Sequence, residues 1–184
     1  MTNRAQYSPG PATGAQVQKG ATRWTLILVR ELRHSPAIVW EALTDPMHLR
    51  EWAPFEADGN LGTVGAKVNL TWIGTGNVVE TSVTRAEPPR VLEFAEIRWE
   101  LEPLGHGTRL TLWHTIPPRF IAWGTAGWHI CFDVLDRLLA GHPIGRIGGP
   151  DTMHLEGWQR LVAEYANQFG VELPKWSPPP AKPS

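Results

Sequence analysis

His114 is the side chain of this 184-residue sequence that is best placed to do chemistry. In the stretch 110–116, residues alternate as in a strand, so His114 shares one side with Leu110, Leu112 and Ile116. An inward histidine among apolar neighbours has two interpretations. It can be a buried neutral histidine bonded to another group. It can also be the single polar group of a pocket, where it binds a ligand or acts as a general acid or base.

Aromatic residues are the second signal, because the chain has ten tryptophans. Trp72, Trp99 and Trp128 are predicted to face the same interior as His114. Large aromatic side chains fill cores, and they also line ligand pockets, so both roles stay open for these three residues. Phe132 and Leu135 follow Trp128 on the same helical face and complete the set of candidate cavity residues.

Other motifs give weaker signals. His129 and Asp133 have the spacing of a metal-binding pair, but they fall on the charged side of a helix, so we expect a solvated face and no metal site. The segment 141–151, GHPIGRIGGPD, follows a helix and lacks a phosphate-binding pattern, so we interpret it as a loop. The single cysteine, Cys131, lies at a core position and is not expected to be a nucleophile.

Composition narrows the class of protein. Seventeen basic and eighteen acidic side chains leave a net charge of -1, which gives no electrostatic reason to expect nucleic acid as a partner. One cysteine cannot form an internal disulfide, which suits a cytoplasmic protein. The N-terminus has no apolar signal segment, and the apolar runs are too short for membrane insertion. We expect no cofactor, and the oligomeric state stays open.

The elements that position these residues follow from periodicity. A first strand at 25–32 precedes two helices that begin at Ser35-Pro36 and Asp45-Pro46, where a capping residue stands before proline. A period of two then predicts strands at 66–73, 77–85, 90–94, 96–102 and 108–116. Helices are predicted at 127–141, GWHICFDVLDRLLAG, ending at Gly141, and from a cap at Asp151 onward. We therefore expect an α+β fold in which six strands form one antiparallel sheet with the helices on one face.

The two ends of the chain lack periodicity. We expect a disordered N-terminal tail at 1–22, one domain at 23–170 and a proline-rich C-terminal tail at 171–184.

Four phrases, in order along the chain, resemble the START-like (SRPBCC) superfamily, in the branch similar to the activator of the heat-shock-protein-90 ATPase. They are SPAIVWEALTDPMHLREW, AEPPRVLEF, IRWELEPLGHGTRLTLWHT and GWHICFDVLDRLLAG. The resemblance implies a helix-grip fold, in which a six-stranded antiparallel sheet wraps around a long C-terminal helix and encloses a hydrophobic cavity.

Three functional hypotheses follow. The leading one is binding of a small hydrophobic or aromatic ligand in a cavity under Trp128, Phe132 and Leu135, with Trp72, Trp99 and His114 around it. The second is an enzyme similar to polyketide cyclases or dehydratases that uses the same cavity, with His114 as acid or base. The third is a chaperone cofactor of the heat-shock-protein-90 ATPase activator type. A fold resemblance does not decide among them.

Overall fold

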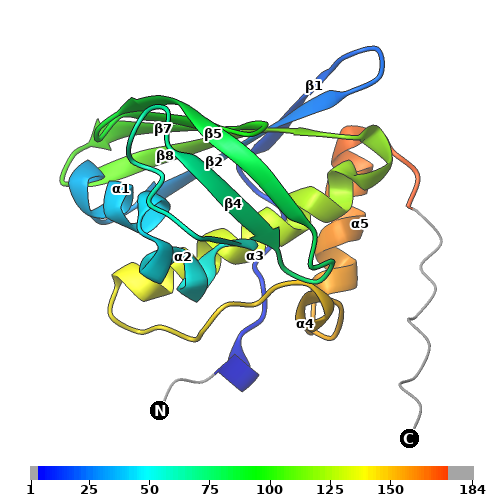
Figure 1. The fold of residues 1–184 in the computed structure, drawn as a ribbon. Coiled ribbons are helices and arrows are strands. Elements are labelled where there is room, and N and C mark those ends of the chain that lie inside the picture. The colour runs from blue at the N-terminus through cyan, green and yellow to red at the C-terminus, as the bar shows by residue number, and fades with distance from the viewer. Residues whose placement is uncertain (1–3, 174–184) are drawn as a thin grey trace, which may run out of the picture.

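One antiparallel sheet curls around a long helix in the computed structural model of the chain, which describes residues 4–173 (Figure 1). The strands lie in the order β1-β2-β8-β7-β6-β5-β4-β3. Their bounds are β1 Ala15–Lys19, β2 Trp24–Leu32, β3 Phe55–Ala57, β4 Lys67–Trp72, β5 Val78–Glu87, β6 Val91–Phe94, β7 Ile97–Leu104 and β8 Gly107–Ile116. The α+β class and the curled antiparallel sheet agree with the sequence-based prediction.

The predicted number of six strands is wrong, because the sheet has eight. The six expected strands are β2 and β4 to β8. The additional strands, β1 and β3, lie at the two edges of the sheet. β1 has the sequence AQVQK and β3 spans three residues, so neither carries an apolar alternation long enough to be recognised.

Two short helices follow β2 as expected. Helix α1 (Pro36–Thr44) and helix α2 (Pro46–Trp52) both begin with proline at the first helical position. The Asp45 side chain accepts a hydrogen bond from the Met47 backbone N–H at 2.8 Å and so caps α2. Trp52, at the end of α2, is fully buried and donates its indole N–H to the Ala42 carbonyl. This bond holds the two helices against each other.

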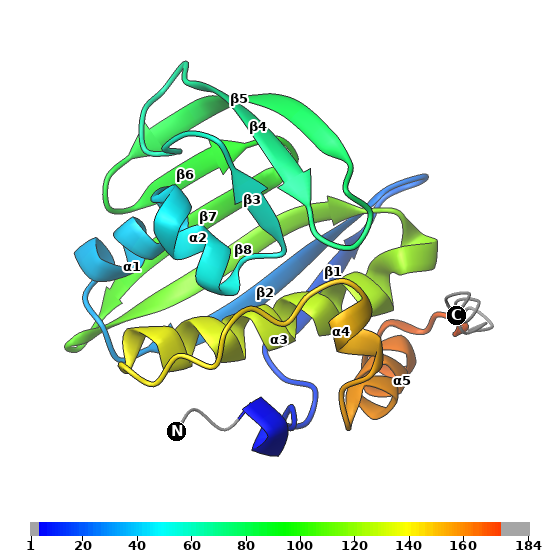
Figure 2. The same ribbon diagram turned by 60° about the horizontal axis from the view of Figure 1, so that its bottom comes forward.

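Helix α3 (Ile121–Leu139) lies along the concave side of the sheet, after the short turn η2 (Pro118–Phe120) (Figure 2). It begins six residues earlier than predicted and ends at Leu139, two residues before Gly141, which has a left-handed φ of 78° and was the predicted stop. The loop after Gly141 runs back along α3 to α4 (Pro150–Met153), beside the helix's N-terminal half (Figure 2). Because of this return path, the loop and α4 lie beside the N-terminal half of α3, although they are far from it in the sequence.

The single final helix expected from Asp151 is instead two helices. Helix α4 is followed by a break at Gly157, whose φ of 86° is left-handed, and α5 (Trp158–Phe169) then begins. Gly149 precedes α4, so Asp151 lies inside that helix and does not cap it. Because a left-handed residue cannot continue an α-helix, Gly157 separates the two segments.

The N-terminal segment differs from the predicted tail at 1–22. Residues 4–22 carry the turn η1 (Arg4–Gln6) and strand β1, which pairs with β2 from Ala15 to Lys19. Tyr7 is 5% exposed. The segment lacks apolar periodicity because it is held to the domain by hydrogen bonds and by single buried side chains such as Tyr7. Of the predicted C-terminal tail, residues 174–184 lie outside the described residues.

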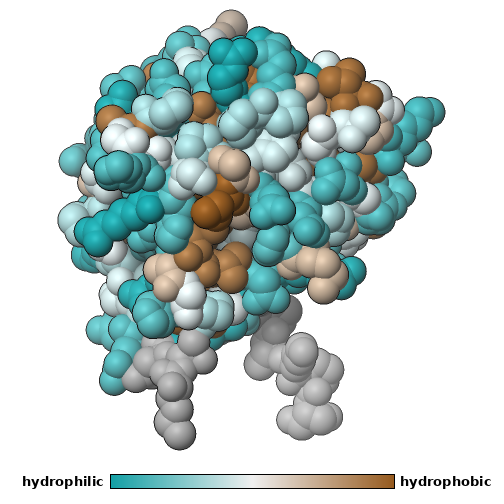
Figure 3. Space-filling view, turned by 90° about the vertical axis from the view of Figure 1, so that its left-hand side faces the viewer, coloured by the Kyte–Doolittle hydropathy of each residue, from teal (hydrophilic) through white to brown (hydrophobic). Residues whose placement is uncertain are grey.

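The outer surface is largely hydrophilic on the face shown in Figure 3, with hydrophobic side chains in small groups. Between residues 4 and 173, no helix combines the length and the apolar character needed to span a membrane.

Candidate functional site

Trp72, His114 and Trp128 lie close together. The rings of His114 on β8 and Trp72 on β4 are nearly parallel, at 9°, with centroids 6.0 Å apart. The Trp128 ring on α3 meets His114 edge-on at 5.8 Å. Its indole Nε1–H donates to His114 Nδ1 at 2.9 Å. The helix and two strands thus hold an aromatic cluster around one imidazole.

His114 is neutral in this environment. Burial lowers its pKa from 6.5 to about 4, and the nearby Arg23 acts in the same direction while Glu96 opposes it. An indole N–H can only donate, so His114 Nδ1 must be the acceptor and the ring proton resides on Nε2. The bond to Trp128 and the burial therefore favour the same uncharged state.

The other three candidate residues lie in the closed core. Trp99, Phe132 and Leu135 are each at most 1% exposed. Trp99 packs against Trp128 at 5.6 Å and against Phe132 at 5.9 Å between ring centroids. None of the three lines either of the hollows described next.

An apolar groove adjoins the N-terminal half of α3. We call it the α3 groove. The part next to β8, which we call the inner part, has a volume of about 220 Å³ and is lined by Pro54, Trp72, His114, Ile116, Phe120, Gly124, Gly127 and Trp128. Its outer part, of about 590 Å³, shares five of these residues, namely Pro54, Trp72, Phe120, Gly124 and Gly127. The volume of the outer part lies within the range of small-molecule sites.

Two glycines on α3 border the groove, and Gly127 leaves open space in it. A Cβ atom at Gly127 would have no heavy atom within 4 Å, so it would project into open space. At Gly124 a Cβ would lie 2.9 Å from Ile116 Cδ1. The helix therefore fills the core with its C-terminal half, at Phe132 and Leu135, and borders the groove with its N-terminal half.

The outer wall of the groove comes from the loop 141–149 and from α4. Its lining residues there are Ile147, Gly148, Gly149, Pro150, Thr152 and Met153. A Cβ at Gly149 would lie 2.7 Å from the Cα of Gly74 in the β4–β5 turn, so the two backbones meet where only glycine fits. Sequence reasoning treated this segment as a plain loop. The run of glycines was the available signal for a close backbone approach.

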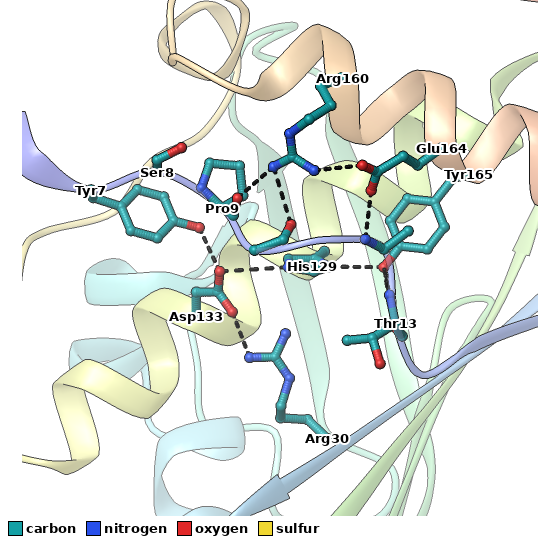
Figure 4. A network of polar contacts seen from close by, with 12 residues as sticks. Tyr7, Ser8, Pro9, Thr13, Arg30, His129, Asp133, Arg160, Glu164 and Tyr165 are labelled. Carbon is teal, nitrogen blue, oxygen red and sulfur yellow. Dashed lines mark hydrogen bonds and ion pairs between the residues drawn. The ribbon is translucent and has the colours of Figure 1, made fainter.

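The prediction that His129 and Asp133 lie on a solvated face of α3 is wrong. His129 is 2% exposed, and Asp133 is only partly exposed, because the N-terminal segment and α5 cover this side of the helix. Asp133 accepts a hydrogen bond from Tyr7 at 2.6 Å and pairs with Arg30 at 2.5 Å (Figure 4). His129 Nδ1 lies 2.7 Å from the Tyr165 hydroxyl of α5.

This polar cluster joins the N-terminal segment to the helices. Tyr165 also donates to the Thr13 carbonyl at 3.1 Å, and Arg160 donates to the Pro9 carbonyl at 2.6 Å (Figure 4). Burial lowers the pKa of His129 and raises the pKa of Tyr165. The cluster is a satisfied buried network, which explains its charged side chains without a ligand.

Neither a metal centre nor an activated thiol is indicated in the part of the chain that the structure describes. No group of three His, Cys, Asp or Glu side chains within residues 4–173 is placed to hold a metal ion. Burial raises the pKa of the Cys131 thiol to about 12, so the thiol is protonated at neutral pH.

Comparison with protein families gives one match. The family described as Activator of Hsp90 ATPase homolog 1-like protein matches residues 33–140, more than half of the chain. The matched region runs from the start of α1 to the end of α3. It contains all of the inner part of the groove but not the wall formed by residues 147–158. Among curated proteins, none matches the sequence.

Several solved structures share the fold. The solution structure of CalU16 from Micromonospora echinospora has a TM-score of 0.62 and 21% identity, over 89% of this chain and 95% of that one. EF2215 from Enterococcus faecalis, a conserved protein of unknown function, has a TM-score of 0.61 and 18% identity, over 84% and 89% of the two chains. DynU16, a protein in the dynemicin biosynthetic locus, has a TM-score of 0.57 and 24% identity, over 67% and 50%.

Proposed function

This chain belongs to the family of Activator of Hsp90 ATPase homolog 1-like proteins, and we propose that its α3 groove binds a small hydrophobic or aromatic ligand. The observation that carries the proposal is the groove itself. It is a hollow of about 590 Å³ joined to an inner one of about 220 Å³. Aromatic walls and a few convergent polar groups are typical of ligand sites.

The chemistry of the lining indicates an uncharged ligand. None of the groove-lining residues, which lie between positions 54 and 158, is charged. Trp72, Phe120 and Trp123 provide flat apolar surfaces, which suit a ring system. Similarity to DynU16, from the dynemicin biosynthetic locus, is a further argument for a small organic ligand.

The enzyme alternative uses the same groove. His114 provides the imidazole in this groove. In its neutral state, Nδ1 accepts the hydrogen bond from Trp128 and Nε2 carries the proton. In that state it can donate a hydrogen bond but cannot accept a proton at Nδ1 without losing the bond to Trp128. We therefore favour binding over acid-base catalysis as the role of this residue.

Filling the groove tests the proposal. Gly127→Leu places a side chain in the open space next to Trp72, and replacing a helical glycine favours helix formation by about 0.8 kcal/mol. We expect the variant to be as stable as the wild type but to lose binding of an apolar tricyclic probe such as fluorene, measured by quenching of tryptophan fluorescence.

The matched control is Glu41→Leu, which adds the same side chain on the exposed side of α1, away from the groove. We expect this control to bind the probe as the wild type does. Undiminished binding by Gly127→Leu would show that the ligand site lies elsewhere, and a wild type that binds no apolar probe would refute the proposed function.

A further inference from the structure

The hydrogen bond between Trp128 and His114 has a fixed direction. The indole Nε1 carries a proton and has no acceptor lone pair, so it donates to His114 Nδ1 across 2.9 Å. Nδ1 must then be unprotonated. In a neutral imidazole one nitrogen holds the proton, so here the proton resides on Nε2.

His114 Nε2 has no partner within residues 4–173. The hydrogen bonds of His114 among these residues comprise only the bond at Nδ1. Nε2 is also absent from the fully enclosed polar atoms that lack a partner, namely His48 Nδ1, Arg98 Nε, Trp113 Nε1 and Arg146 Nη1. This nitrogen is therefore not fully enclosed, and His114 lines the inner part of the α3 groove.

The surroundings keep the imidazole neutral and oriented. Trp72 stacks on one of its faces, and Trp128 meets it edge-on. The charged groups that act on the ring are Glu96 and Arg23, which form an ion pair with each other, so their effects on the ring partly cancel. A flip of the ring that exchanges Nδ1 and Cδ2 would break the bond to Trp128, and a rotation out of the present ring plane would also break the stacking with Trp72.

We propose that Trp128 is a positioning residue that holds His114 as the Nε2–H tautomer, so that the groove prefers neutral apolar ligands with a carbonyl oxygen over the matching alcohols and hydrocarbons. This inference rests on the proposed function and names the ligand class of the same groove.

The preference follows from the number of hydrogen bonds that each ligand can complete. A carbonyl oxygen accepts from Nε2–H and has no proton of its own to satisfy. An alcohol also accepts this bond, but its own proton then faces the apolar side chain of Ile116, and a donor that loses water without gaining a partner is costly. A hydrocarbon leaves Nε2–H itself unpaired. We expect the ketone to be preferred by on the order of tenfold.

The tautomer is tested without any ligand. Nitrogen NMR of labelled protein distinguishes a protonated ring nitrogen from an unprotonated one, and we expect wild-type His114 to be protonated only at Nε2 at neutral pH. Trp128→Phe keeps an aromatic ring but removes the donor. We expect this variant to show a mixture of tautomers. The matched control is Trp123→Phe. It removes an indole that lines the same groove but does not bond to His114, so the tautomer should not change.

Ligand preference is tested with fluorenone, fluorenol and fluorene, which share one ring skeleton. The ratio of their dissociation constants is compared between proteins, because differences in hydration of the free ligands then cancel. We expect the ketone-to-alcohol preference to fall about tenfold in Trp128→Phe and in His114→Phe, and to persist in Trp123→Phe. If Trp128→Phe does not fold, two measurements still test the proposal. They are the tautomer of His114 in the wild type and the ketone-to-alcohol ratio in His114→Phe.

The possible outcomes separate the two proposals. A ketone-to-alcohol ratio that is the same in the wild type and in His114→Phe, or a proton on Nδ1 in the wild type, would overturn the present inference while the proposed function survives. Binding of none of the probes would overturn both the function and the preference, even with the expected tautomer.

Discussion

Replacing His114 should change how the stability of the protein depends on pH. The folded protein holds this histidine at a pKa of about 4, below the value of 6.5 for a free histidine. Between these values the unfolded chain binds more protons than the folded one. The free energy of unfolding therefore decreases as pH falls from 6.5 towards 4.

The size of the effect follows from the two pKa values. Over the full range from 6.5 to about 4, the linked free energy is about 3 kcal/mol, and between pH 7.5 and 4.5 it is about 2.5 kcal/mol. In His114→Phe this contribution is absent. Its unfolding free energy should therefore fall by about 2.5 kcal/mol less than that of the wild type over the same interval.

Urea denaturation at pH 7.5 and 4.5 measures both proteins. The variant should be less stable at pH 7.5, because the Trp128 N–H loses its acceptor, which costs about 1–3 kcal/mol. At pH 4.5 the difference in unfolding free energy between the two proteins should become smaller or change sign. His129 and the carboxylates titrate in both proteins and so cancel in the comparison. His106→Phe, at an exposed turn, is the control and should follow the wild type. Parallel pH profiles for His114→Phe and wild type would refute a buried, neutral His114.

Other predictions concern the segments that surround α3. Deleting residues 1–20 removes β1 and the buried Tyr7 and should lower the melting temperature by about 10 to 20 °C, whereas an unchanged melting curve would show that this segment is not docked. Tyr165→Phe should cost about 1–3 kcal/mol in urea unfolding, because it leaves a buried histidine nitrogen unpaired; a neutral effect would contradict the network. Gly149→Ala should weaken binding of fluorene in titrations, since its Cβ would lie 2.7 Å from the β4–β5 turn, while Gly141→Ala, also at positive φ but in open space, should not. Equal binding by these two alanine variants would contradict the close contact.

Patterns among residues close in sequence were sufficient to predict most of the sheet and the first two helices. Alternation in the strand that holds His114, and the Ser35-Pro36 and Asp45-Pro46 pairs, depend only on neighbours in sequence. The edge strands β1 and β3 were missed because each is short and is stabilised mainly by pairing with a partner strand.

The polar side of α3 shows where periodicity fails. A period of 3.6 assigns His129 and Asp133 to solvent, yet Tyr7 of the N-terminal segment, Arg30 of β2 and Tyr165 of α5 cover them. Only the tertiary structure brings these partners together. Periodicity likewise predicted one interior for all the candidate residues, whereas the packing separates Trp99, Phe132 and Leu135 in the core from the residues that line the groove.

Locating a bound ligand by NMR tests the central claim most directly. The indole N–H signals of the protein report on separate places, so fluorenone can be titrated into labelled protein while each signal is followed. The α3 groove predicts that the signals of Trp72, Trp123 and Trp128 shift, whereas those of Trp40 and Trp113, which do not line it, stay in place. Shifts confined to Trp40 or Trp113, or no shifts at all at saturating ligand, would contradict the assignment of the groove as the ligand site.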